Sequence, residues 1–192
     1  GLSSRILHGS GDADPWCGSL TTPLVQTATF VNDAVGVNKG HAYSRVSNPT
    51  VDALERQLGA LEHALPAVCF STGLAAETGL FLALLKAGDH AVVGSAIYGG
   101  TTRLFRQVLS ELGVQATFVD ATNTAQTIAA IQANTKLVFI ESPANPTLEL
   151  TDIAAIAAAS RAKNIPLAVD NTFLTAVLQR PLDLGADICV YS

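Results

Sequence analysis

Residues 167–172 read Leu-Ala-Val-Asp-Asn-Thr, and this stretch decides the fold. Three apolar residues run without a break into Asp170, and polar residues follow at once. The run Leu137–Glu141 is built in the same continuous way. Continuous apolar runs, as opposed to alternating ones, indicate strands that are buried on both faces, as in a parallel sheet covered by helices.

Outward from this stretch, short apolar runs alternate with segments of helical periodicity. The expected strands are Ala67–Phe70, Ala91–Gly94, Ala116–Asp120, Leu137–Glu141, Leu167–Asp170 and Ile188–Tyr191. The expected helices between them are Leu74–Lys86, Gly100–Leu112, Thr124–Ala133 and Asp152–Lys163. The sequence therefore predicts an α/β fold with a mostly parallel sheet, in which a ligand binds beyond the carboxyl ends of the strands.

The first 47 residues have a different composition. They are rich in Gly, Ser, Thr and Asp, contain no convincing amphipathic helix, and look extended only at Leu24–Phe30 and Gly40–Arg45. Long irregular segments often have a binding role. We therefore expect residues 1–47 to form an arm that reaches a neighbouring subunit. A ligand-binding domain then follows over residues 48–192, beginning with a helix that Asn48 caps and Pro49 starts.

Composition excludes several classes of protein. The 192 residues are 48% hydrophobic and 14% charged, which excludes a disordered chain. A net charge of −5 gives no electrostatic reason to expect nucleic-acid binding. The longest apolar stretch, Leu74–Leu85, contains Glu77 and is too short to span a bilayer, so no membrane association is expected.

Cysteine and histidine usage indicates a cytoplasmic protein without a metal site. The three cysteines form no metal-type pair and are expected to be reduced thiols, and the four histidines are scattered without ligand spacing. The chain begins with Gly1 and shows no targeting signal. We expect it to be part of a longer protein.

Two loops could bind the anionic and aromatic parts of a ligand. Ser71–Leu74 joins a strand to a helix, and the free amides beside Gly73 would make an anion site, although a plain helix start explains the same residues. Tyr98 stands beside two glycines and could stack on a flat aromatic ligand and carry a proton through its hydroxyl. A packing role for this tyrosine stays open.

Three more residues suggest charge and hydrogen-bond partners. Asp170 ends an apolar strand, where a carboxylate needs a positive partner such as a protonated pyridine nitrogen; helix capping is the alternative. Asn145 lies between two prolines that fix its loop and could donate to a ligand oxygen, or simply form a turn. Arg45 suits a phosphate, although an ordinary surface arginine fits as well.

The order of these residues resembles the Cys/Met-metabolism family of pyridoxal 5'-phosphate (PLP) enzymes over nearly the whole chain. The motifs that carry this resemblance are Tyr43-Ser44-Arg45-x-x-Asn48-Pro49-Thr50, Ser71-Thr72-Gly73-Leu74-Ala75-Ala76, Lys86-Ala87-Gly88-Asp89, Tyr98-Gly99-Gly100-Thr101, Glu141-Ser142-Pro143-Ala144-Asn145-Pro146-Thr147, Asp170-Asn171-Thr172-Phe173 and Gln179-Arg180-Pro181-Leu182. The resemblance implies an aspartate-aminotransferase-like fold (PLP fold type I), a homodimer at least, and usually a homotetramer.

The resemblance also implies a role for each site residue. Gly73, the Leu74 backbone and Ser192 would hold the PLP phosphate. Tyr98 would stack on the ring and serve in catalysis, and Thr172 would lie near the opposite ring face. Asp170 would pair with the pyridine nitrogen and Asn145 would lie near the ring hydroxyl. Tyr43 and Arg45 would reach the phosphate of the neighbouring subunit.

One part of the family pattern lies outside this sequence. The family's Schiff-base lysine closes a Ser-x-Thr-Lys motif, and the chain ends at the serine, Ser192. We therefore expect the lysine just beyond Ser192, followed by the C-terminal domain that binds the substrate carboxylate in this family.

The loop motifs resemble the trans-sulfuration branch most, which implies a cystathionine γ-lyase or γ-synthase that acts on sulfur amino acids and cleaves or forms a C–S bond at Cγ. Cystathionine β-lyase, O-acyl-homoserine sulfhydrylase and methionine γ-lyase are the alternatives within the family, and Gly100 argues against the last of them, which tends to carry cysteine there. A non-catalytic PLP-binding protein is the alternative of another class.

Overall fold

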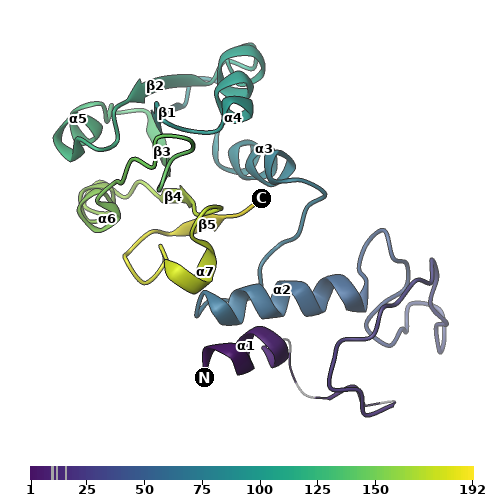
Figure 1. The fold of residues 1–192 in the computed structure, drawn as a ribbon. Coiled ribbons are helices and arrows are strands. Elements are labelled where there is room, and N and C mark those ends of the chain that lie inside the picture. The colour runs from purple at the N-terminus through teal and green to yellow at the C-terminus, as the bar shows by residue number, and fades with distance from the viewer. Residues whose placement is uncertain (10, 12, 16) are drawn as a thin grey trace. The chain divides into compact units, whose positions relative to one another are not determined.

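The computed structural model describes residues 1–9, 11, 13–15 and 17–192. The chain divides into two compact units, Gly1–Cys69 and Phe70–Ser192. Helix α2 lies in the first of these units, and the expected domain boundary at residue 48 stays a prediction. Figure 1 labels the helices and strands of both units.

The second unit is built on a five-stranded parallel sheet, as predicted. Its strands are β1 (His90–Gly94), β2 (Gln115–Val119), β3 (Thr135–Glu141), β4 (Leu167–Asp170) and β5 (Ile188–Val190). Their order across the sheet is β2-β1-β3-β4-β5. The chain thus runs from β1 to one side and then crosses β1 to reach β3, so a topological switch lies between β1 and β3. Ligands bind at the carboxyl ends of strands beside such a switch.

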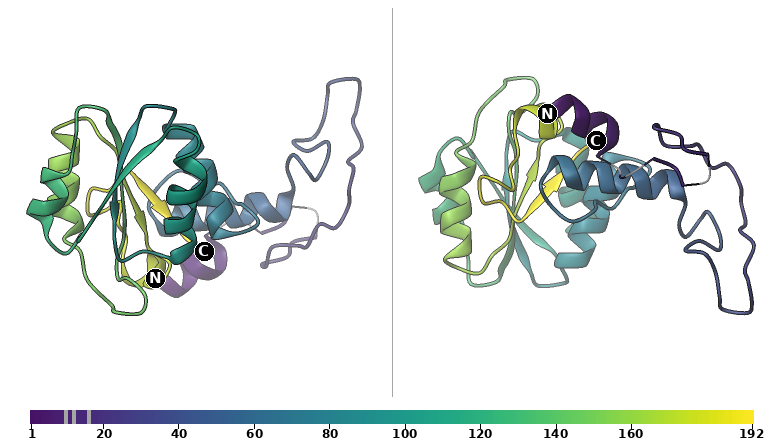
Figure 2. Two further views of the ribbon diagram at one scale, coloured as in Figure 1. Left: turned by 90° about the horizontal axis from the view of Figure 1, so that it is seen from above. Right: turned by 90° about the horizontal axis from the view of Figure 1, so that it is seen from below.

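Helices cover both faces of this sheet, as Figure 2 shows, with α3 and α4 on one face and α5 and α6 on the other. The helices of this unit are α3 (Gly73–Leu84), α4 (Gly99–Arg103), the π-helix η1 (Leu104–Leu109) that continues α4, α5 (Thr124–Ala129), α6 (Ile153–Arg161) and α7 (Thr175–Leu178). The short helix α7 was not predicted. The other helices of this unit confirm the predicted ones, with ends shifted by at most four residues.

The core explains why the strands are continuously apolar. Every residue of β1 and β4 is buried. On one face the ring of Phe81 from α3 packs against Phe105 and Phe139, with ring centroids 4.6 and 5.0 Å apart. On the other face Ile153 and Ile156 of α6 pack with the remaining strand side chains. Burial on both faces holds the strand ends, and the loops that follow them, in fixed positions.

The first unit contains helices α1 (Leu2–His8) and α2 (Pro49–Leu61). Helix α2 begins as predicted, because the Asn48 side chain accepts a hydrogen bond from the Thr50 amide and Pro49 takes the first position. Helix α1 corrects the expectation of an arm without a helix. It lies against α2, and the Gln57 side chain donates to the Ile6 carbonyl. Tertiary packing of this kind stabilises short helices that sequence periodicity does not reveal.

Three expected extended segments, Ala67–Phe70, Leu24–Phe30 and Gly40–Arg45, have different outcomes. Ala67–Phe70 is not a strand; its backbone is irregular, and the amides of Ala67 and Cys69 donate to the carbonyl and the carboxylate of Glu55 instead of a neighbouring strand. In the arm, Thr29 and Tyr43 form an antiparallel bridge, flanked by backbone hydrogen bonds that join residues 28–30 to residues 42–44. Antiparallel pairing between these two segments of the arm is therefore limited to three residues on each side.

Membrane-spanning helices and metal-binding clusters are both missing from the part of the chain that the structure describes. Within residues 1–9, 11, 13–15 and 17–192, no helix has the length and apolar character needed to cross a membrane. Among the same residues, no group of three or more His, Cys, Asp or Glu side chains could hold a metal ion.

Candidate functional site

A pocket of about 320 Å³ opens beyond the carboxyl ends of β1, β3, β4 and β5, beside the first turn of α3. This is the edge of the sheet at which the sequence predicts ligand binding. The pocket is lined by Gly73, Leu74, Glu77, Ile97, Tyr98, Gly99, Glu141, Asn145, Asp170, Thr172, Phe173, Val190 and Ser192.

Seven of the nine predicted site residues line this pocket, although they come from segments far apart in the sequence. They are Gly73, Leu74, Tyr98, Asn145, Asp170, Thr172 and Ser192. The other two, Tyr43 and Arg45, belong to the first unit, where the Arg45 guanidinium lies 5.0 Å from the centre of the Tyr43 ring. Their predicted contact with a neighbouring subunit stays a prediction.

The first turn of α3 has the form of an anion site. The Thr72 side chain caps the helix by accepting from the Ala75 amide at 3.0 Å. The amides of Gly73 and Leu74 have no acceptor within the helix, because the first four amides of any helix lack one. Ser192 lies so close that a Cβ at Gly73 would overlap its side chain. Only glycine therefore permits this serine hydroxyl and these two amides to converge.

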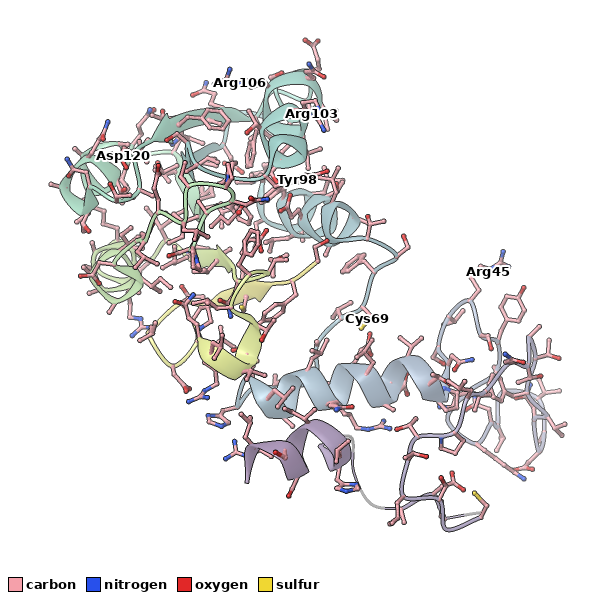
Figure 3. All side chains as sticks on the ribbon, in the orientation of Figure 1. Arg45, Cys69, Tyr98, Arg103, Arg106 and Asp120 are labelled. Atoms are coloured by element: carbon pink, nitrogen blue, oxygen red, sulfur yellow. The ribbon has the colours of Figure 1, made fainter. Side chains whose placement is uncertain are left out.

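Tyr98 stands immediately before α4, and its side chain is 57% exposed. Figure 3 shows it near the start of this helix, with Arg103 and Arg106 farther along the same segment. A Cβ at Gly100 would overlap the tyrosine ring, so the ring lies directly over this glycine. The glycine sets the position of the ring, and the exposed ring lines the pocket as a stacking surface requires.

Asp170 and Thr172 form a short hydrogen-bonded chain that reaches Ser192. The Thr172 amide and hydroxyl both donate to Oδ1 of Asp170, at 2.9 and 2.5 Å. The Thr172 hydroxyl oxygen accepts from the Ser192 amide at 3.0 Å. Asp170 is only 7% exposed, so its carboxylate is held in one orientation in a largely water-free position.

Glu141 is the register partner of Asp170 on the adjacent strand, so the two carboxylates end neighbouring strands side by side. The side chain of Glu141 accepts from the Tyr98 amide at 2.7 Å and from the Asn145 amide at 3.2 Å. Burial raises the pKa of Glu141, these two amides lower it, and the negative charge of Asp170 raises it again; the net direction is upward.

Glu77 is a third buried acid in the pocket, 3% exposed on α3. Its carboxylate accepts from the Thr101 hydroxyl at 2.5 Å. Burial raises the pKa of Glu77 to about 7, the Thr101 hydrogen bond opposes that rise, and the charges of Asp170 and Glu141 add to it. A carboxylate with such a pKa changes its charge near neutral pH, which is typical of functional sites.

These charges make the pocket suitable for a ligand that is positive at one end and anionic at the other. Three carboxylates line it, and none of the thirteen lining residues is Lys, Arg or His. A buried carboxylate such as Asp170 needs a cationic partner, which the protonated ring of PLP would supply. The amides beside Gly73 would take its phosphate. The residues present therefore fit PLP.

Sequence reasoning missed Glu77 and Glu141 as pocket residues. Glu141 ends a buried apolar strand just as Asp170 does, and the same argument about an isolated carboxylate would have found it. Glu77 is the one charged residue in the apolar run Leu74–Leu85, which also marks it as a buried acid. The apolar lining residues Ile97 and Phe173 carry no comparable signal.

Comparisons with known proteins agree with this geometry. The family model described as "Cys/Met metabolism PLP-dependent enzyme" matches residues 3–192. The whole chain is 43% identical to a probable cystathionine gamma-synthase of Herpetosiphon aurantiacus, covering 60% of that protein, and 41% identical to a cystathionine beta-lyase of Coxiella burnetii, covering 49% of it. The chain therefore spans about half the length of the curated relatives it matches.

A solved structure extends the likeness to the backbone. The chain superposes over its full length on cystathionine gamma-lyase from Lactobacillus plantarum complexed with L-serine, with a TM-score of 0.95 and 39% identity, and covers 50% of that chain. The predicted PLP fold type I is thereby confirmed. The three relatives carry three different reaction names, so the likeness does not distinguish one reaction from another.

Proposed function

The chain belongs to the Cys/Met metabolism family of PLP-dependent enzymes, and we propose that the whole protein breaks or forms a carbon–sulfur bond at Cγ of an amino acid. Cystathionine γ-lyase or γ-synthase is the proposed activity. The observation that carries the proposal is the buried Asp170 carboxylate, which shares one pocket with the α3 amides and the exposed Tyr98 ring.

Seven of the thirteen lining residues have a proposed task in binding PLP. The amides of Gly73 and Leu74 and the hydroxyl of Ser192 hold the phosphate. Tyr98 stacks on one ring face and Thr172 lies near the other, while Asn145 donates to the ring hydroxyl. Because Thr172 fixes the orientation of Asp170, the carboxylate is already aimed when PLP arrives.

Two residues of this chain contribute to the proposed reaction. PLP supplies an electron-withdrawing ring that stabilises negative charge at Cα of the substrate. Asp170 keeps that ring protonated by placing a negative charge beside its nitrogen, which favours the cationic form. The hydroxyl of Tyr98 moves a proton toward the departing group at Cγ. The lysine that anchors PLP is expected beyond Ser192.

We further propose that the enzyme works as a homodimer at least, and as a homotetramer by resemblance, in the cytoplasm. Several apolar residues of the arm are exposed, including Leu24, Val31 and Val46, which are 79%, 83% and 84% exposed. Apolar area of this kind favours burial against another surface. The proposed partner is a second copy, whose PLP phosphate Tyr43 and Arg45 would contact.

The test uses the full-length protein loaded with PLP. Release of 2-oxobutyrate from cystathionine is expected for a γ-lyase, whereas cystathionine formation from cysteine and an activated homoserine is expected for a γ-synthase. Absorbance in the visible range first establishes that PLP is bound. If the loaded protein turns over no sulfur amino acid in either assay, the proposed activity is wrong.

A further inference from the structure

Glu141 joins two loops that carry different parts of the site. Oε2 accepts from the Tyr98 amide at 2.7 Å, and Oε1 accepts from the Asn145 amide at 3.2 Å. Tyr98 follows β1 and α4 begins after it, whereas Asn145 follows β3. One buried side chain, 7% exposed, therefore ties the loop of the proposed stacking residue to the loop of the proposed ring-hydroxyl donor.

The two loops depend on Glu141 to different degrees. The Asn145 loop has other attachments, because the Ala144 amide donates to the Glu149 carbonyl and Gln179 donates to the Ser142 carbonyl. Tyr98 precedes a helix that has no side-chain cap, and Glu141 is the acceptor for its backbone amide. We therefore expect loss of Glu141 to displace Tyr98 more than Asn145.

Only a carboxylate can make both bonds. Glutamate presents two acceptor oxygens, whereas glutamine presents one oxygen and an NH₂ group that would face one of the two amide hydrogens. Hydrogen bonds to a charged acceptor are shorter and about twice as strong as neutral ones. The burial of a charge beside Asp170 is unfavourable in itself, and the two charge-assisted hydrogen bonds from the Tyr98 and Asn145 amides offset part of that cost.

We propose that Glu141 is a positioning residue for PLP, which fixes the separation of the Tyr98 and Asn145 loops and thereby the width of the slot that receives the ring. This proposal rests on the proposed function, because it assumes that the slot receives PLP. Glu141 holds the two loops through their backbone amides, and the side chains of Tyr98 and Asn145 contact the ring.

The test measures PLP binding to the full-length apoprotein for the wild type, Glu141→Gln and Glu141→Asp. Loss of one charge-assisted bond predicts PLP affinity about tenfold weaker or more in Glu141→Gln. The circular dichroism of bound PLP, which reports the orientation of the ring, is expected to change as well. Glu141→Asp keeps both oxygens on a shorter side chain, so a smaller loss of affinity with an altered dichroic band is expected.

Asp89→Asn is the matched control. Asp89 is also buried, 8% exposed, and accepts from the backbone amide of Lys86 at 3.0 Å, but it precedes β1 at the opposite edge of the sheet. This variant is expected to lower the melting temperature while PLP affinity and the dichroic band stay as in the wild type. A general loss of stability would affect all three variants alike.

The outcomes separate the two proposals. If the wild type does not bind PLP, the proposed function is wrong. If the wild type binds PLP and both Glu141 variants bind it with unchanged affinity and an unchanged dichroic band, Glu141 does not position the ring. If Glu141→Gln does not fold, Glu141→Asp alone decides by the same two measurements.

Discussion

The two edges of the parallel sheet use buried polar residues in different ways. At the amino edge, the ring of the fully buried His90 has both nitrogens 2.8 Å from threonine hydroxyls, those of Thr135 and Thr117. At the carboxyl edge, Glu141, Asp170 and Glu77 are all less than 10% exposed and line one pocket without a basic residue among its lining.

The difference distinguishes polar residues that serve folding from polar residues that serve binding. Buried polar groups are normally paired within the chain, as His90 is. Negative charges that gather around a pocket raise the free energy of the folded chain unless a cation joins them. The carboxylates at the carboxyl edge therefore lower the stability of the folded chain but favour binding of a cationic ligand. Substitutions at this edge are expected to change ligand binding, whereas substitutions at the amino edge are expected to change only stability.

The largest effect is expected for Asp170→Asn. The change keeps the size of the side chain but removes the negative charge that faces the proposed ring cation. An unpaired buried cation costs about 3 kcal/mol or more, which corresponds to PLP binding that is weaker on the order of 100-fold. Fluorescence titration of the full-length apoprotein with PLP measures this loss.

Asp187→Asn provides the control from the amino edge. Oδ2 of Asp187 accepts from the backbone amide of Leu167, the first residue of β4, at 2.9 Å. This substitution should leave PLP affinity unchanged. Equal losses of affinity in the two variants would show that the edges do not differ in the way described.

Much of this contrast could be predicted from the sequence, because strand ends are encoded locally. The run Leu167–Asp170 is a strand with the predicted bounds, and Asp170 stands where a buried apolar segment meets the ligand-binding edge. Parallel strands must end together, so residues 98, 145, 170 and 172 could be expected to converge without knowledge of the sheet order. The anion site at Gly73 could be predicted in a similar way, because the free amides at the start of a helix are also a local feature of the sequence.

Other features depend on contacts that periodicity does not encode. All residues of α1 are exposed although the helix packs beside α2, so the sequence shows no clear apolar face. Ala67–Phe70 has strand-like composition, yet two of its backbone amides donate hydrogen bonds to Glu55 instead of to a neighbouring strand. The partners of Glu141 lie 43 and 4 residues away, and only the folded chain shows that one carboxylate serves both loops.

The second prediction concerns Glu77. Burial raises the pKa of this carboxyl group from 4.5 to about 7. The folded chain binds this proton more tightly than the unfolded chain, so stability is greatest below pH 4.5 and falls as the pH rises through about 7. A shift of this size corresponds to about 3 kcal/mol. Glu77→Gln removes the titration and keeps an acceptor for Thr101.

Urea unfolding of the full-length apoprotein at several pH values between 5 and 8 tests this prediction. The wild type should lose stability relative to Glu77→Gln as the pH rises, by up to about 3 kcal/mol over the whole titration. A difference between the two proteins that does not change with pH would mean that Glu77 keeps an ordinary pKa. Burial and repulsion between the carboxylates at the carboxyl edge would then not destabilise the folded chain in the way inferred here.

The smallest effect is expected for His90→Gln at the amino edge, and its pH dependence has the opposite sign. Burial lowers the pKa of His90 below 6.5, so the unfolded chain takes up this proton first and the wild type loses stability as the pH falls below 6.5. At pH 8, where both states are neutral, the variant should be less stable by about 1–2 kcal/mol, because glutamine cannot satisfy both threonine hydroxyls in the same geometry. Acidification should narrow that gap, whereas PLP affinity should match the wild type throughout. Weaker PLP binding in His90→Gln would show that polar residues at the amino edge also support the pocket, and the separation between folding and binding residues would fail.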